Sequence, residues 1–159
     1  MYKRILVPLD GSKLAECALP HAESLATGCA AEKIILVSVT ERVQGYRPIE
    51  DHGQPVIQRE RLVPEAVGKL QKQAEKYLSR IAKGMEARGI SVETDVLLGS
   101  PADEIIMYAN EPGADIIVIS SHGRSGVSRW AYGSVADRIF RASCVPVLMI
   151  RAPGCIPGF

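Results

Sequence analysis

Residues 115–150 open with the run Asp115-Ile116-Ile117-Val118-Ile119-Ser120-Ser121-His122-Gly123 and continue, nine residues later, with Gly133-Ser134-Val135. The apolar run is typical of a buried β-strand that ends in small residues, and a helical pattern follows the second glycine. Glycine and serine leave backbone N–H groups unobstructed, and a helix start adds the positive end of its dipole. The stretch therefore predicts two backbone anion sites and points to a nucleotide-binding protein.

Apolar β-rich runs alternate with helical patterns along the rest of the chain. We expect strands at 3–9, 33–40, 91–98, 115–120 and 145–150, and helices at 14–26, 64–89, 101–112 and 134–142. Such alternation predicts an α/β fold, a single doubly wound five-stranded parallel sheet with helices on both faces. The long polar segment 41–63 lacks periodicity, which indicates a functional flap or a mobile loop.

Proline, glycine and serine mark where the expected elements bend or end. Pro20 should kink the first helix, and Gly28 is a plausible end for it. Ser100 and Asp103 have the spacing of a capping box at a helix start. Pro146 lacks a backbone donor, so the strand that follows it should lie at an edge of the sheet.

The carboxyl ends of the strands are where a ligand is expected, at the point where the strand order reverses. Three segments should meet there: Val7–Asp10, Val39–Thr40 and Ser120–Gly123. Asp10 directly follows the first strand, so its carboxylate could accept hydrogen bonds from ribose hydroxyls or cap the helix that begins near Ser12. Both roles stay open at this point.

Other polar residues near the expected site have less specific patterns. Arg124 and Arg129 could pair with phosphate oxygens, although solvated side chains are the commoner case. His122 fits a turn histidine with a structural hydrogen bond better than a catalytic acid. The chain has no P-loop, no G-x-G-x-x-G after its first strand and no G-x-S-x-G, so no catalytic residue is assigned.

Composition excludes several classes of protein. The net charge of +1 and the 5% of aromatic residues argue against a nucleic-acid or anionic-membrane partner. The four cysteines match no zinc spacing, so no metal site is expected, and Cys17 and Cys144 are expected to be small buried hydrophobes. No signal peptide or membrane span is recognised, and we expect a reducing cytoplasm.

Two stretches together resemble the universal stress protein family. The first is Ile5-Leu6-Val7-Pro8-Leu9-Asp10-Gly11-Ser12; the second combines Ser121-His122-Gly123-Arg124-Ser125-Gly126, Gly133-Ser134-Val135-Ala136-Asp137-Arg138 and Cys144-Val145-Pro146-Val147. The similarity covers residues 1–151 as one domain, with 152–159 as a flexible tail. It implies strand order 3-2-1-4-5, an adenine-nucleotide alpha-hydrolase-like fold, and a homodimer formed through the last strand, Val145–Ile150.

The nucleotide-binding branch of that family is marked by G-x-x-G, nine residues, then G-[ST]. Gly123 and Gly133-Ser134 match, whereas Ser120 stands where the pattern has its first glycine. The resemblance implies that Asp10 binds the ribose, and that Pro8, Leu9 and Val39 border the adenine. The residues it assigns around the phosphates are Ser120, Ser121, Gly123, Arg124, Gly133, Ser134 and Val135.

We therefore expect a regulatory protein of the stress response that binds ATP, or else ADP or AMP. Mg²⁺ can accompany bound ATP. Nucleotide would order the 124–132 loop and the 41–63 flap and so change a surface read by an unknown protein partner. Two alternatives stay open. One is an interaction module without nucleotide, for which Ser120 is the argument, and the other is an enzyme such as a slow ATPase.

Overall fold

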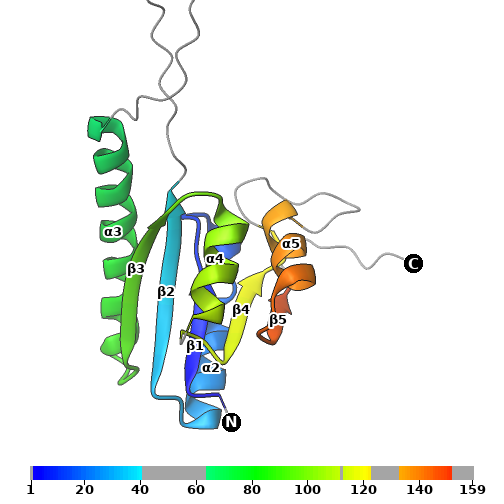
Figure 1. Ribbon diagram of the computed structural model, residues 1–159. Coiled ribbons are helices and arrows are strands. Elements are labelled where there is room, and N and C mark those ends of the chain that lie inside the picture. Colours follow the sequence, from blue (N-terminus) through cyan, green and yellow to red (C-terminus); the bar gives the residue numbers. More distant parts are fainter. Residues whose placement is uncertain (1, 41–63, 112, 123–132, 152–159) are drawn as a thin grey trace, which may run out of the picture.

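The computed structural model describes residues 2–40, 64–111, 113–122 and 133–151 (Figure 1). Its elements follow the expected alternation along the chain. They are β1 (Arg4–Pro8), α1 (Lys13–Glu16), α2 (Leu19–Cys29), β2 (Lys33–Thr40), α3 (Pro64–Glu86), β3 (Val92–Leu98), α4 (Pro101–Asn110), β4 (Ile116–Ser120), α5 (Ser134–Ala142) and β5 (Val147–Ile150). The 41–63 and 124–132 loops, Gly123 and the 152–159 tail lie outside the described residues.

The five strands form one parallel sheet in the order β3-β2-β1-β4-β5. The expected strand order is therefore confirmed. Figure 1 shows α4 and α5 in front of the sheet and α2 behind it, with α3 alongside β3. The order reverses between β1 and β4, because the chain builds outward from β1 to β3 and then returns to the other side of β1.

Alternate side chains of each central strand pack into two separate hydrophobic cores, one on each face of the sheet. Ile5, Val7 and Leu36 belong to the cluster that α1, α2 and α3 cover. Leu6 and Ile117 belong to the cluster covered by α4 and α5. Strands buried on both faces read as continuous apolar runs, which is why they were recognisable in the sequence.

The two outer strands are the ones expected at the edges. β3 has four exposed residues, three partly buried ones and none that is buried, and among the described residues β5 pairs with β4 alone. Pro146 immediately precedes β5, where its carbonyl accepts the backbone N–H of Ile117 at 2.8 Å. A residue without an N–H is tolerated there because it begins an edge strand.

The first expected helix is divided at Cys17 and Ala18, just before Pro20, and its second part does not end at Gly28. Pro20 occupies the first turn of α2, so the predicted interruption takes the form of two helices, α1 and α2. The prediction for Gly28 is wrong, since α2 runs through Cys29 and the left-handed residue is Ala30, with φ of 49°. That conformation lets the N–H of Ala31 reach the carbonyl of Ala26 at 2.8 Å, which satisfies a helix-end acceptor.

The predicted capping box of α4 is also wrong. Ser100 does occupy the N-cap position, but its side chain makes no capping hydrogen bond. Asp103 instead forms an ion pair with Arg138 of α5, with 2.6 Å between the carboxylate oxygen and the guanidinium nitrogen. The carboxylate that the local pattern assigned to a capping hydrogen bond is thus bound by an arginine of the neighbouring helix.

The cysteines are less buried than expected. Cys144 is exposed, which contradicts the prediction of a small buried hydrophobe, and Cys17 and Cys29 are partly buried. Cys144 lies between the end of α5 and the start of β5, in a connection that passes over the surface.

Asp115 ties the start of β1 to the start of β4. Its Oδ2 accepts the backbone N–H groups of Lys3 and Arg4, both at 2.9 Å. The hydrogen bonds from Arg4 and then Lys3 hold the pKa of this carboxyl below its ordinary value of 3.8. The lowered pKa means that the stabilisation is present above pH 3.8 and is lost as the pH falls through the folded-state value.

We expect Asp115→Asn to lower the free energy of unfolding by about 1 kcal/mol at pH 7, because the acceptor loses its charge. The difference from the original protein should vanish as the pH falls through the lowered folded-state pKa of Asp115, below which its carboxyl is also neutral. Urea titrations at several pH values measure this, with the exposed Glu86→Gln as control. A difference that is independent of pH would contradict the assignment.

Candidate functional site

The carboxyl ends of β1, β2 and β4 lie along one edge of the sheet. The N–H of Leu9 donates to the carbonyl of Val37 at 2.8 Å, so the chain after β1 continues alongside β2. On the other side of the reversal, the N–H of Gly133 donates to the carbonyl of Ser121 at 2.8 Å. This bond joins the start of α5 to the end of β4, although twelve positions separate the two residues in the sequence.

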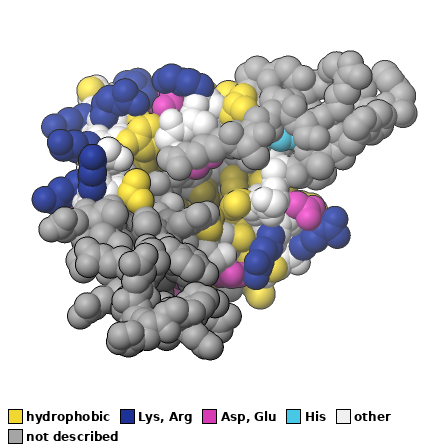
Figure 2. Space-filling view, turned by 90° about the horizontal axis from the view of Figure 1, so that it is seen from above, with side chains coloured by type: hydrophobic (Ala, Val, Ile, Leu, Met, Phe, Trp, Pro, Cys, Tyr) yellow, Lys and Arg dark blue, Asp and Glu magenta, His cyan; other side chains and the backbone are white. Residues whose placement is uncertain are grey.

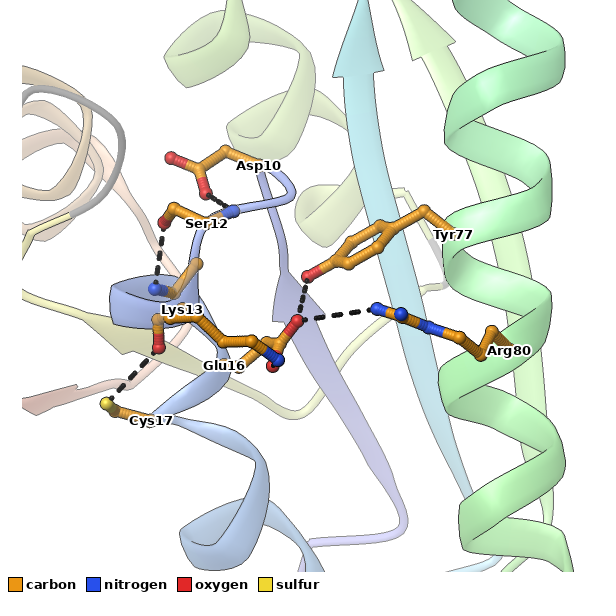
Figure 3. A network of polar contacts seen from close by, with 8 residues as sticks. Asp10, Ser12, Lys13, Glu16, Cys17, Tyr77 and Arg80 are labelled. Carbon is orange, nitrogen blue, oxygen red and sulfur yellow. Dashed lines mark hydrogen bonds and ion pairs between the residues drawn. The ribbon is translucent and has the colours of Figure 1, made fainter.

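Asp10 forms a tight turn between β1 and α1. Its Oδ1 accepts the backbone N–H of Ser12 at 2.9 Å, and Gly11 between them has φ of 85° (Figure 3). Ser12 is the N-cap of α1, because its Oγ accepts the N–H of Ala15 at 3.1 Å. Asp10 is therefore not the helix cap, because Ser12 takes that position. The Asp10 carboxylate instead stabilises the turn that precedes the helix.

Three consecutive polar residues at the end of β4 are buried. Ser120, Ser121 and His122 are 4%, 0% and 4% exposed. The Oγ of Ser121 lies 3.0 Å from Nδ1 of His122, and the N–H of His122 lies 3.5 Å from the Oγ of Ser120. The expectation that His122 makes a structural hydrogen bond is confirmed.

Gly133 lies where β4 and α5 approach each other closely. A Cβ at this position would lie 3.2 Å from the carbonyl oxygen of Ser121 and 3.7 Å from Cα of His122. Gly133 is the N-cap of α5, and Ser134 is the first helical residue, so Ser134 does not cap the helix. With no side-chain cap, the start of α5 keeps its backbone N–H groups and dipole for another acceptor.

The remaining expected site residues divide between the sheet and the loops. Val39 and Val135 are both partly buried against the core under α4 and α5, and Pro8 is buried at the end of β1. Gly123 and Arg124 lie outside the described residues, as does Arg129.

A polar network that sequence patterns did not indicate joins α1 to α3 beside the Asp10 turn. The hydroxyl of Tyr77 donates to Oε1 of Glu16 at 3.3 Å, and Lys13 and Arg80 pair with the same carboxylate (Figure 3). Burial, and after it the charge of Glu16, raises the pKa of Tyr77 well above its ordinary value. No local pattern could have found this contact, because 61 positions separate Glu16 from Tyr77.

Neither a metal cluster nor a membrane span is found among the described residues. No three of their histidine, cysteine, aspartate or glutamate side chains are grouped to hold an ion. Within the same residues, no helix combines the length and apolar character needed to cross a membrane.

Comparison with known proteins finds a match to the model of the universal stress protein family over residues 1–151. Universal stress protein MJ0577 of Methanocaldococcus jannaschii is 34% identical over 155 residues, which cover 95% of this chain and 96% of the relative. A solved structure of MJ0577 has a TM-score of 0.77 at 29% identity, and the match covers 97% of this chain and 99% of that one.

Two further solved structures share the fold. One is a universal stress protein in complex with cAMP, with a TM-score of 0.60, 21% identity, and coverage of 94% and 97% of the two chains. The other is a protein of the same family from Arabidopsis thaliana with AMP bound, with a TM-score of 0.58, 15% identity, and coverage of 96% and 93%. At these identities the likeness extends to the fold alone.

Proposed function

This chain belongs to the universal stress protein family, and we propose that within it the protein acts as a regulatory protein that binds an adenine nucleotide, with ATP as the ligand. The observation that carries the proposal is the hydrogen bond between Gly133 and Ser121. It sets the start of α5, which has no side-chain cap, beside the end of β4 at the reversal of strand order. The cAMP and AMP complexes of two proteins with this fold support the same class of ligand.

Each part of the nucleotide is assigned in this proposal to the residues that the family resemblance implies. The Asp10 carboxylate accepts from the ribose hydroxyls, and Pro8, Leu9 and Val39 border the adenine. The phosphates are assigned to the end of β4 and the start of α5, where the helix dipole favours negative charge. The proposed N–H donors are those of Ser134 and Val135 in the first turn of α5, because the N–H groups of Ser121 and Gly133 already donate to the carbonyls of Ile150 and Ser121. The residues proposed there are Ser120, Ser121, Gly123, Arg124, Gly133, Ser134 and Val135.

The proposed homodimer forms through the last strand. Support comes from the edge position of β5 and from two large apolar side chains near it. Leu148 on β5 is 38% exposed and Phe140 on α5 is 59% exposed. Pairing two copies would cover an edge that otherwise leaves backbone groups open to other chains.

The cytoplasmic location and the regulatory role belong to the same proposal. Cys17, Cys29 and Cys144 carry free thiols, which supports a reducing compartment. Changes in the 41–63 and 124–132 segments on nucleotide binding would be the signal that a protein partner reads.

Calorimetry with protein freed of bound ligand tests the proposed function. ATP, ADP, AMP and cAMP are titrated in turn, and mass spectrometry identifies the ligand released from freshly purified protein. Saturable heat with at least one adenine nucleotide supports the proposal. No heat at millimolar nucleotide and no released nucleotide would rule it out and favour the interaction module.

Ser120 is the feature that favours that alternative, and its position makes a specific prediction. Ile116 and Val118 face the core under α1–α3, so alternation along β4 turns the Ser120 side chain to the same face. It is 4% exposed, so we place its Cβ within the protein and not against a nucleotide beyond the strand end.

We therefore expect Ser120→Gly to change ATP affinity by less than about threefold and to cost about 1 kcal/mol of stability, as glycine does inside a strand. Calorimetry and thermal unfolding measure the two quantities. Tightening of more than about tenfold would mean that serine crowds the ligand.

A further inference from the structure

A row of positive side chains runs along the outer face of α3. Its members are Lys69, Lys72, Lys76, Arg80 and Lys83, all exposed, and we call this row the α3 basic stripe. Their spacings of three and four residues place them within about a quarter of the helix circumference and over about 21 Å of its length. Figure 2 shows such side chains in dark blue at the left of the molecule, the side where Figure 1 places α3.

The stripe differs from most other cations of the described surface, because four of its five members have no ion pair with a described carboxylate. Six cations elsewhere are in ion pairs: Lys3, Lys13, Lys33, Arg88, Arg138 and Arg141. Within the stripe, only Arg80 has an ion pair with a described residue, at 3.8 Å from Glu16.

Like charges three and four positions apart on a helix repel each other and destabilise it. In the stripe every neighbouring pair is of this kind, from Lys69 and Lys72 through to Arg80 and Lys83. The surface is hollowed between Lys69, Lys72 and Lys76, so one anionic group can approach several ammonium groups there. An anionic partner would relieve the repulsion among the four lysines of the stripe, which have no ion pair with a described residue.

The shape and surroundings of the stripe favour a narrow partner. Glu75 and Glu86 are exposed on the same helix, and Glu93 and Asp95 are exposed on the adjacent edge strand β3. A flat anionic membrane or a DNA duplex would meet these carboxylates together with the lysines, which opposes binding. An acidic polypeptide lying along the helix would meet the stripe alone, and acidic residues at helical spacing would repeat at the same intervals.

We infer that the α3 basic stripe binds an acidic segment of another protein, rich in aspartate and glutamate and lying along α3. The inference is independent of nucleotide binding, since the stripe lies on the outer face of α3 and includes none of the proposed nucleotide ligands. Contacts between exposed charges are screened by salt, so binding should be strongest at low ionic strength.

The test uses this chain and a fluorescein-labelled oligo-L-glutamate of about 15 residues, which is long enough to span the stripe in either a helical or an extended conformation. Fluorescence anisotropy gives the dissociation constant at about 20 mM and about 150 mM NaCl. The triple variant Lys69→Gln/Lys72→Gln/Lys76→Gln removes three charges of the stripe. The control Lys3→Gln/Arg138→Gln/Arg141→Gln removes three exposed cations elsewhere, so both variants lose the same net charge.

We expect the stripe variant to weaken binding by about tenfold and the control by less than about twofold. Equal weakening by the two variants, or no binding at the lower salt concentration, would overturn the inference. Duplex DNA and phosphatidylserine vesicles are titrated in parallel. If either one binds more tightly than the oligo-glutamate, and only the stripe variant loses that binding, the acidic-segment assignment is overturned. The stripe would then be a binding surface for DNA or for the membrane.

Discussion

Asp10→Ala is expected to weaken ATP binding by about 10- to 100-fold. In the proposed site the carboxylate accepts from ribose hydroxyls, and hydrogen bonds to a charged group contribute about 1.5–3 kcal/mol. The same substitution also removes the turn bond from the N–H of Ser12. Isothermal titration calorimetry with ligand-free protein measures the affinity, and thermal unfolding measures the cost to the turn.

Asp10→Asn separates the two contributions. The asparagine amide keeps an oxygen that can accept the Ser12 N–H, so the turn and the thermal stability should be retained. The NH₂ group of the asparagine is uncharged and donates hydrogen bonds, so it cannot accept from a ribose hydroxyl as the carboxylate does. The affinity for ATP should therefore still fall. The matched control is Glu111→Ala, an exposed carboxylate beyond the end of α4, which should bind ATP unchanged. Unchanged affinity in Asp10→Asn would contradict the ribose role.

Leu36→Ala is expected to have the largest effect on stability. Leu36 is 0% exposed on β2, in the core that includes Leu78 and Met85 of α3. Removing a buried leucine side chain loses its transfer free energy and leaves a cavity, which costs about 3 kcal/mol. For a chain of this length that corresponds to a fall in Tm of about 6–12 °C.

Leu98→Ala is the matched control, because Leu98 is 38% exposed at the end of the edge strand β3. The same chemical change should there cost about 1 kcal/mol or less. Urea denaturation gives both free energies, and comparable m-values would show that the extent of unfolding is the same. Equal destabilisation by the two variants would contradict the burial of Leu36 in the core under α1–α3.

Most of the fold could be predicted from local patterns. The strand Lys33–Thr40 and the helix Ser134–Ala142 have the expected bounds, since both depend on apolar periodicity within a few residues. Pro20 was expected to kink one helix, and it instead occupies the first turn of a second helix, where its missing N–H costs no intrahelical hydrogen bond. The strand order, by contrast, came from the family resemblance, because periodicity does not say which strands are neighbours.

The predictions that failed depended on partners distant in sequence or on details of helix ends. Asp103 was expected to act in a capping box, but Arg138 of another helix binds it. Ala30 takes the left-handed position because backbone hydrogen bonds at the end of α2 offset the steric cost. Cys144 is exposed because the α5–β5 connection runs over the surface.

By itself the sequence determined the elements and the type of chemistry at the sheet edge. The small residues after β4, the glycine before α5 and the carboxylate after β1 are all readable locally, because each belongs to a turn or a helix start. Only the tertiary structure decided which of them meet. Gly133 against Ser121, and Glu16 against Tyr77, are contacts made by the packing of elements far apart in the chain. Likewise, the helical spacing of the α3 lysines can be read from the sequence. That no described carboxylate forms an ion pair with them follows from how the surrounding elements pack.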